Sequence, residues 1–185
     1  MPETFFIGCT HFDHANIIEY SKRPYASIKR MNEALVENWN DVVKPGDTVW
    51  MLGDFCWHSG NPEFHFRRLH GHKNLIVGNH DMKGVLALPW QRATYSFVGK
   101  IGQHFFHLCH YPLREWDGYW KGTVHLHAHV HGTLPDVTGS MDVSCERIGY
   151  QPISLSEIEK RFAEWRAQGG GRRAHDSSTT ERKAP

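Results

Sequence analysis

Residues 74–81 have the sequence Asn-Leu-Ile-Val-Gly-Asn-His-Asp, an apolar run of strand length that ends in glycine and then in polar side chains. Residues 48–54 (Thr-Val-Trp-Met-Leu-Gly-Asp) and 4–11 (Thr-Phe-Phe-Ile-Gly-Cys-Thr-His) repeat this design. Short apolar runs are typical of strands buried on both faces of a sheet. Because open α/β sheets bind ligands beyond the carboxyl ends of their strands, we expect the polar residues after the three runs to be neighbours. These residues are Cys9, His11, Asp54, Asn79, His80 and Asp81.

Two helices are predicted between these strands. In the segment 27–43, apolar residues recur at spacings of three and four, which is typical of a helix with one buried face. This helix is expected to begin at a Ser27 cap and to end at the Lys-Pro-Gly sequence of 44–46. The Asn-Pro-Glu sequence at 61–63 supplies a cap, a first-turn proline and an acidic first turn for a short helix to about residue 69.

The second half of the chain is richer in predicted strands. They are residues 95–98, 103–108, 123–126 and 141–143, and a last helix over 154–167 begins with the capping pattern Ser-Leu-Ser-Glu. This order of elements predicts the α/β class, with two packed mixed β-sheets flanked by helices. We expect one domain over residues 1–167. Residues 168–185 have almost no apolar side chains and are predicted to form a disordered polar tail.

Composition limits the classes of function. The 185 residues suffice for one domain with a sizeable core, and a net charge of +1 gives no general attraction to nucleic acid or membrane. The four cysteines are far apart, so a disulfide framework is not expected. The sequence has no signal-peptide pattern and no apolar run approaching the roughly 20 residues of a membrane span. We therefore expect a cytoplasmic protein with free thiols.

Histidine is over-represented, with 15 residues in the chain. Histidine is the commonest metal ligand and titrates near neutral pH, so its enrichment favours a metal or acid–base site. His110 follows the predicted strand 103–108, and His125, His127, His129 and His131 alternate along the chain. Alternate residues of an extended segment face the same side, so two of them can meet one metal. We interpret His125 and His127 as strand residues or as partners of ligands.

These residues match a known pattern. The calcineurin-like metallophosphoesterases have, in order, the motifs D-x-H, G-D, G-N-H-D, a single histidine and G-H-x-H. The chain resembles them from residue 4 to about residue 160 and is most similar to small stand-alone bacterial and phage members. The matching segments are Cys9-Thr10-His11, Gly53-Asp54, Gly78-Asn79-His80-Asp81, His110 and Ala128-His129-Val130-His131. The resemblance implies a four-layer αββα sandwich.

The resemblance also implies a binuclear metal centre with a bridging hydroxide as the nucleophile. One ion would take Cys9, His11, Asp54 and His131, and the other would take Asp54, Asn79, His110 and His129. Bridging by Asp54 suits two ions about 3.5–4 Å apart, which hold both the attacking and the leaving oxygen. His80 would assist the leaving group, with Asp81 orienting its ring, and His14 would contact the substrate.

Residue 9 departs from the pattern, because the family's usual aspartate is Cys9 here. A thiolate is a soft ligand that suits zinc or iron, whereas a carboxylate also suits manganese. As a ligand, Cys9 would shift the preference of the two ions toward zinc or iron, with manganese the remaining candidate. Alternatively, Cys9 is a small buried residue that leaves the first ion weakly held. A nucleophilic cysteine is a third reading, but the arginine-bearing phosphate loop it needs is missing.

Three other positions affect the predicted site. Ala128 replaces the glycine of G-H-x-H, which alanine can do where φ is negative. Asp13 stands beside His14 where glycine is common, and its charge near the mouth would disfavour highly anionic substrates. Arg114 borders the loop at 116–120 and is a candidate contact for the substrate phosphate.

The predicted function is metal-dependent hydrolysis of phosphomonoesters or phosphodiesters, with nucleotide-type or small diester substrates favoured. The alternative from another class is a catalytically inactive, metal-binding interaction module on the same fold. Retention of His80 and Asp81 favours the enzyme, because a scaffold does not need them. A nuclease is less favoured, since neither the net charge nor a basic stripe supplies a nucleic-acid footprint.

Overall fold

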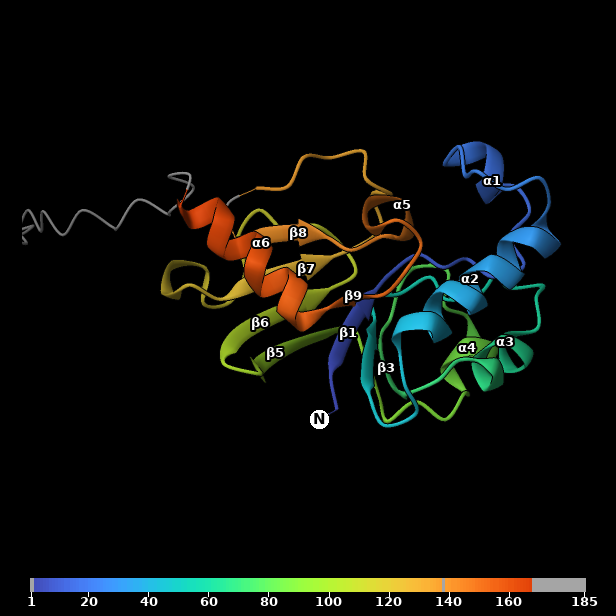
Figure 1. Ribbon diagram of the computed structural model, residues 1–185, viewed down its shortest axis with the longest axis horizontal. Coiled ribbons are helices and arrows are strands. Elements are labelled where there is room, and N and C mark those ends of the chain that lie inside the picture. Colours follow the sequence, from blue (N-terminus) through green and yellow to red (C-terminus); the bar gives the residue numbers. More distant parts are fainter. Residues whose placement is uncertain (1, 138, 168–185) are drawn as a thin grey trace, which may run out of the picture.

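The computed structural model describes residues 2–137 and 139–167, so the predicted tail at 168–185 lies outside the described residues. No helix within these two ranges is long and apolar enough to cross a membrane. The elements follow one another as Figure 1 shows. They are β1 (Thr4–Ile7), α1 (Ile17–Tyr20), α2 (Ile28–Val42), β2 (Thr48–Met51), α3 (Pro62–Arg68), β3 (His72–Ile76), α4 (Lys83–Leu86), β4 (Arg92–Thr94), β5 (Ser96–Ile101), β6 (His104–Cys109), the 3-10 helix η1 (Tyr119–Lys121), β7 (Val124–His127), β8 (Ser140–Asp142), α5 (Cys145–Ile148), β9 (Ile153–Ser154) and α6 (Leu155–Ala167).

The first sheet has the strand order β4-β3-β2-β1-β9. Strands β1 to β4 are parallel, with Thr4 opposite Thr48 and Thr48 opposite His72, whereas β9 is antiparallel to β1. Because β1, β2 and β3 are adjacent and parallel, their carboxyl ends lie along one edge of the sheet. The loops after these three strands therefore start side by side.

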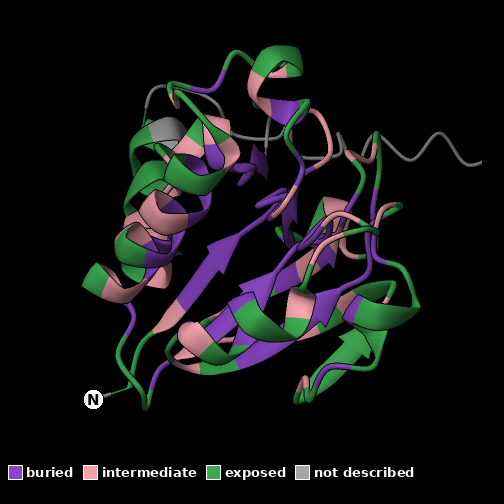
Figure 2. Cartoon of the chain, turned by 90° about the vertical axis from the view of Figure 1, so that its right-hand side faces the viewer, coloured by how far each residue is buried: buried purple, intermediate pink, exposed green. Residues whose placement is uncertain are grey.

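Successive residues of the central strands point to opposite faces and fill two cores. Phe5 packs on one face in a core that includes Leu35 and Trp39 of α2. Phe6 packs on the other face in a core shared with the second sheet, where its ring stacks on that of Phe106 at 5.7 Å between centroids. The first sheet thus lies between a helical layer and the second sheet, and its central strands are buried (Figure 2).

The second sheet has the strand order β5-β6-β7-β8. Strands β5 and β6 are antiparallel and the remaining pairs are parallel, so both sheets are mixed. Helix α6 adds Ile158 to the core between the sheets. On the outer face of the second sheet, the ring of Trp116 lies 5.0 Å from that of His125. The predicted fold class, two packed mixed sheets flanked by helices, is confirmed.

The predicted helix starts are confirmed by their caps. Ser27 Oγ accepts the backbone N–H of Arg30 at 3.3 Å at the start of α2, and Asn61 Oδ1 accepts that of Phe64 at 3.1 Å at the start of α3. Several strand bounds differ from the prediction, and β5 ends at Ile101 rather than at residue 98. Strands β4 (Arg-Ala-Thr) and β9 (Ile-Ser) were not predicted, because neither contains an apolar run that a sequence pattern could reveal.

Leu35→Ala should lower the free energy of unfolding by about 2–5 kcal/mol, because it leaves a cavity at a position that is 2% exposed. Leu86→Ala makes the same chemical change at a position that is 42% exposed and should cost about 1 kcal/mol or less. Urea unfolding followed by circular dichroism measures both losses. Equal losses in the two variants would contradict the packing of α2 on the first sheet.

Candidate metal centre

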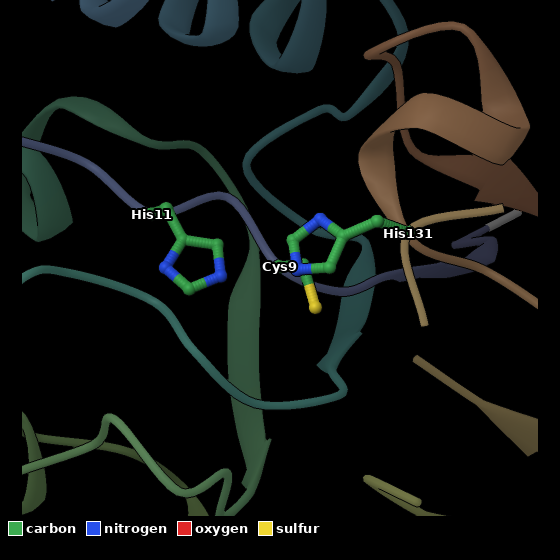
Figure 3. A group of neighbouring side chains, drawn as sticks. All are labelled: Cys9, His11 and His131. Atoms are coloured by element: carbon green, nitrogen blue, oxygen red, sulfur yellow. The ribbon is translucent and has the colours of Figure 1, made fainter. Parts of the chain in front are cut away.

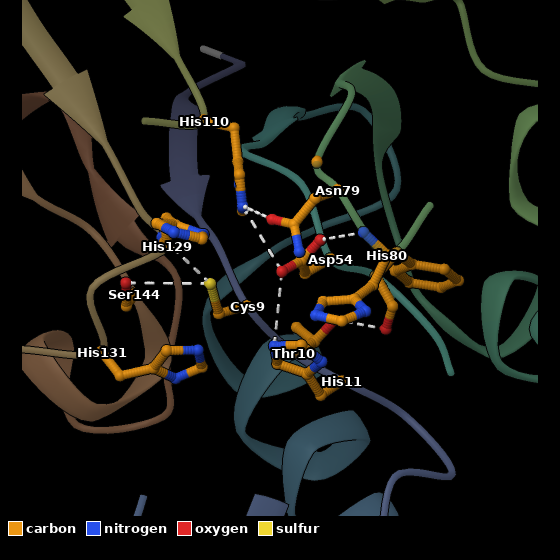
Figure 4. A network of polar contacts seen from close by, with 12 residues as sticks. Cys9, Thr10, His11, Asp54, Asn79, His80, His110, His129, His131 and Ser144 are labelled. Atoms are coloured by element: carbon orange, nitrogen blue, oxygen red, sulfur yellow. Dashed lines mark hydrogen bonds and ion pairs between the residues drawn. The ribbon is translucent and has the colours of Figure 1, made fainter. Parts of the chain in front are cut away.

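The loops that follow β1, β2 and β3 come together at the carboxyl edge of the first sheet (Figure 4). Two glycines allow the second and third loops to touch. Gly53 has a φ of +87°, and a Cβ there would lie 2.5 Å from His110 Nδ1 and 2.7 Å from Gly78 Cα. A Cβ on Gly78 would lie 2.6 Å from the amide nitrogen of Asp54. Glycine is therefore required at both positions for this close approach.

The Asp54 carboxylate lies among the converging side chains. Its Oδ2 is 3.6 Å from His11 Nε2 and 3.4 Å from His110 Nε2, and the residue is 1% exposed. Its Oδ1 accepts the backbone N–H of His80 at 2.8 Å. Burial opposes ionisation, but the hydrogen bond and charge of His110 outweigh it and lower the pKa of Asp54 to about 2. One buried, ionised oxygen thus faces two histidine rings.

His110 directs Nε2 into the same space. Its Nδ1 is 2.7 Å from the carbonyl oxygen of Leu52, which can only accept, so Nδ1 carries a proton. Its Nε2 lies 3.1 Å from Asn79 Oδ1 and 3.4 Å from Asp54 Oδ2. Burial lowers the pKa of His110, but Asp54 outweighs burial and raises it above its usual value. The raised pKa favours a second proton, on Nε2. A metal ion bound to Nε2 would take the place of that proton.

His11 is 2% exposed, and neither of its buried ring nitrogens has a hydrogen-bond partner. Burial lowers the pKa of His11 well below its usual value, despite the opposing charge of Asp54. The ring is therefore neutral and keeps a free lone pair. Buried polar atoms without partners are costly and rare in proteins. A metal ion would supply the missing partner, so His11 fits a ligand role.

Cys9, His11 and His131 form one group of candidate ligands (Figure 3), and Cys9, Asp54 and His110 form a second. Within each group the ligand atoms lie within 4.8 Å of one another. Cys9 is fully buried, and its sulfur accepts the backbone N–H of His129 at 3.2 Å. Burial raises the pKa of the Cys9 thiol well above its usual value, and the charge of Asp54 adds to the shift. The thiol therefore keeps its proton unless a metal displaces it.

Backbone strain is concentrated at the candidate ligands. Eight described non-glycine residues have positive φ, and five of them are Cys9 (54°), His11 (51°), Asp54 (57°), His129 (70°) and His131 (49°). The left-handed conformation costs such a residue of order 1–3 kcal/mol and persists only where the surrounding structure imposes it. Such strain is typical of functional sites, because it directs side chains that a relaxed backbone would point elsewhere.

His80 and His14 lie beside His11 without belonging to either group of candidate ligands. Their ring centroids are 5.5 and 5.4 Å from that of His11. The His14 ring stacks flat on Trp57, with centroids 3.7 Å apart, and the His80 ring lies 5.1 Å from the same tryptophan. The structure thus brings both predicted residues next to the candidate ligands, against one aromatic wall.

The expectation that Asp81 orients the ring of His80 is wrong. The Asp81 carboxylate accepts three backbone N–H groups, from Gly78 at 2.8 Å and from Asp54 and Phe55 at 2.9 Å each. Burial raises the pKa of Asp81 to about 6, against the effect of these three donors. Because both of its oxygens are bound to the backbone, Asp81 joins the second and third loops and positions Asp54 instead.

Asp13 is held by hydrogen bonds to neighbouring elements. Its carboxylate accepts the Asn32 side-chain N–H at 2.7 Å and the Asn61 backbone N–H at 2.8 Å. It also lies 3.0 Å from Nε2 of His65, a residue of α3. Burial opposes its ionisation, but the Asn61 N–H and His65 outweigh burial and lower the pKa of Asp13, so the carboxylate stays charged. The expected effect of this charge on anionic substrates stays a prediction.

Arg23 and Glu146 lie behind the candidate ligands and contact them. Arg23 is 4% exposed and donates to the carbonyl oxygens of Cys9 and Thr10. It also pairs with Glu146, whose Oε1 lies 2.9 Å from His131 Nδ1. Burial opposes the ionisation of Glu146, but His131 and Arg23 outweigh it and lower its pKa. The two residues are 123 positions apart, so no local pattern connects them.

The remaining predicted positions have simpler surroundings. His125 Nδ1 lies 2.9 Å from the carbonyl oxygen of His107 and its Nε2 accepts the backbone N–H of Leu113, which supports the structural interpretation of this residue. Ala128 is not among the residues with positive φ, as its side chain requires. Arg114 is exposed, and no described contact joins it to the candidate ligands. All four cysteines are free thiols, as expected.

The donor atoms of the site could hold a metal ion. They comprise imidazole nitrogens, a buried carboxylate, an amide oxygen and a thiol, which are donor types that transition metals accept. A bound cation would satisfy both the unpartnered nitrogens of His11 and the buried charge of Asp54.

Several known proteins are similar to this chain in sequence or in fold. No protein-family model matches the chain. The uncharacterised protein MJ1445 of Methanocaldococcus jannaschii is 34% identical over 171 residues, which cover 86% of this chain and 91% of that protein. The crystal structure of AQ665, a protein of unknown function from Aquifex aeolicus, has a TM-score of 0.69 at 25% identity, covering 87% of this chain and 100% of that one. A solved archaeal phosphodiesterase has a TM-score of 0.48 at 18% identity, covering 77% and 82%.

The similarity to MJ1445 covers most of both chains. It therefore shows that the two proteins belong to one family. The structure has the two mixed sheets that the sequence resemblance implies. It also brings residues of the matching motifs together at strand ends, as that resemblance implies. The chain belongs to the family of the Methanocaldococcus jannaschii protein MJ1445.

Proposed function

We propose that the protein is a metal-dependent phosphoesterase with a binuclear centre. The observation that carries this proposal is the position of Asp54 Oδ2 between His11 Nε2 and His110 Nε2, at 3.6 and 3.4 Å. A carboxylate placed between two sets of nitrogen ligands can serve two ions. The unpartnered His11 nitrogens support the proposal, since a bound cation would satisfy them.

The ligands proposed for the two ions divide the site into two halves that share Asp54. The first half consists of Cys9, His11, Asp54 and His131, and the second half consists of Asp54, Asn79, His110 and His129. In support, the Asn79 amide oxygen lies 3.1 Å from His110 Nε2, and the His110 and His129 rings are 5.1 Å apart. When bound, the ions supply a water of lowered pKa as the nucleophile and offset the charge of the phosphoester.

His80 is the residue proposed to assist the leaving group. Its backbone N–H is fixed on Asp54 Oδ1 at 2.8 Å, and its ring lies 5.5 Å from that of His11. From there the imidazole can donate a proton to the leaving oxygen or stabilise its developing charge. Asp81 is proposed as a positioning residue, because its carboxylate holds the backbone of Asp54.

Small phosphoesters, including nucleotide-type compounds and small diesters, are the proposed substrates. The half-buried ring of Trp57, which stacks on His14 beside the candidate metal ligands, is the proposed surface for a planar base. We retain His14 as a proposed substrate contact on this wall and Arg114 as a proposed phosphate contact. The net charge of +1 does not favour a nucleic-acid polymer.

The direct test of the function is hydrolysis of bis-p-nitrophenyl phosphate and of p-nitrophenyl phosphate by metal-free protein supplied with Mn, Zn or Fe. We expect turnover that requires added metal. A folded protein that binds metal but hydrolyses neither compound with any of the three ions would support the inactive interaction module instead. Comparison of the two rates separates diester from monoester preference.

Asp54→Asn and His80→Ala should separate metal binding from chemistry. Asp54→Asn should lower the content of both ions and abolish activity, because the shared carboxylate loses its charge. His80→Ala should keep the metal content while kcat falls by about 10²–10⁴, the usual effect of removing a positioned acid or base. Elemental analysis and steady-state kinetics measure these changes. Unchanged metal stoichiometry in Asp54→Asn would contradict the assignment of the two halves.

Cys9→Asp should move the preferred ion from zinc or iron toward manganese, because a hard oxygen replaces a soft sulfur. Cys9→Ser is the matched control, since it keeps the size of the side chain but binds metal poorly, and it should lose metal from the first half. Elemental analysis after equilibration with equal concentrations of the three ions measures the preference. The same metal profile in all three proteins would show that Cys9 does not coordinate.

A further inference from the structure

A buried ion pair lies behind the first half of the centre. Arg23 Nε and Nη2 each lie 2.8 Å from Glu146 Oε1, and the Arg23 side chain is fully buried. Arg23 lies between α1 and α2, whereas Glu146 lies in α5, so the pair joins distant parts of the chain. Burying two charges is expensive, and a buried pair contributes little net stability unless its geometry is good and its other polar atoms are hydrogen-bonded.

Arg23 holds the backbone that carries the candidate thiol ligand. Its Nη2 donates to the carbonyl oxygen of Cys9 at 2.7 Å, and its Nη1 donates to that of Thr10 at 2.8 Å. Cys9 has a φ of 54°, a left-handed conformation that needs support from its surroundings. The rigid guanidinium fork satisfies both carbonyl groups at once and keeps the turn that directs the Cys9 sulfur into the site.

Glu146 holds the histidine of the same half. Its Oε1 accepts from His131 Nδ1 at 2.9 Å, so the proton of the neutral ring lies on Nδ1 and leaves Nε2 unprotonated. Figure 3 shows this other nitrogen on the side of the Cys9 sulfur. A carboxylate behind a histidine fixes the ring and makes the opposite nitrogen a better metal ligand.

The second half of the centre has a different support. His110 Nδ1 donates to the carbonyl oxygen of Leu52, a neutral backbone group, at 2.7 Å. No described contact of Arg23 or Glu146 reaches His110, Asn79 or the ring of His129. A change in the ion pair should therefore affect one half of the centre and leave the other nearly unchanged.

We propose that Arg23 and Glu146 are positioning residues that set the metal affinity of the first half of the centre independently of the second. Arg23 fixes the strained turn at Cys9 and anchors Glu146, and Glu146 orients His131. The inference rests on the binuclear centre proposed above. It adds that the two metal positions have separate supports, one from a buried ion pair and one from the main chain.

The test uses Co²⁺ as the probe, because a thiolate bound to Co²⁺ gives a charge-transfer band in the near ultraviolet. This band reports the half to which Cys9 is assigned. The double variant Arg23→Gln/Glu146→Gln removes both charges together, so neither is left buried without a partner. We expect half-saturation of the thiolate band at about 10–100-fold higher Co²⁺ than in the unchanged protein. The affinity of the second half, from competition with a chromogenic chelator, should change less than about 3-fold, well below that range.

The matched control is Arg147→Gln/Asp136→Asn. It neutralises a partly exposed ion pair that Arg147, the next residue of α5, makes with Asp136, and it should leave both affinities unchanged.

If the double variant does not fold, Glu146→Asp is the second variant. It keeps the charge beside Arg23 but shortens the reach to His131, and it should weaken Co²⁺ binding as seen by the thiolate band alone. Equal weakening of both halves, or of neither, would overturn the inference. An unchanged protein that binds two Co²⁺ ions without a thiolate band would overturn it too, while leaving the proposed function standing. Failure of the unchanged protein to bind Co²⁺ would sink both proposals.

Discussion

The burial of one ionised carboxylate between two histidine rings is the constraint on which the rest of this site depends. Asp54 is 1% exposed, and its Oδ2 faces His11 and His110. A charge in that position is unfavourable unless cations or donors surround it. The protein offers His80 N–H to the other oxygen and directs histidine nitrogens toward the first. A bound metal ion would complete these surroundings.

The backbone around Asp54 is built to keep it in place. Gly53 and Gly78 let two loops approach more closely than any side chain would allow, and Asp81 joins these loops through three backbone N–H groups. Left-handed conformations at Cys9, His11, Asp54, His129 and His131 then turn the side chains inward. The energy stored in these conformations is offset by the two cores on either side of the first sheet, which anchor the strands.

The two halves of the proposed centre differ in chemistry as well as in support. The first half contains a fully buried thiol whose pKa burial raises, so binding of a metal there must release a proton. It is also the half that Arg23 and Glu146 hold. The second half uses an amide oxygen and a histidine that rests on a backbone carbonyl group. Such asymmetry suits a centre whose two positions take different ions or release them at different concentrations.

The sequence by itself indicated the three strands that carry the site, the α/β class and the candidate ligands, because apolar runs that stop at glycine and polar residues are local patterns. It also predicted the caps at Ser27 and Asn61. Elements as short as β9 lack periodicity, and bounds such as the end of β5 depend on pairing with β6, so these were missed or misplaced. Only the tertiary structure decided what Asp81, Asp13, Arg23 and Glu146 do, because each acts on partners brought near by the fold. Residue identity shows which chemistry a side chain can perform, but folding decides which atoms it meets.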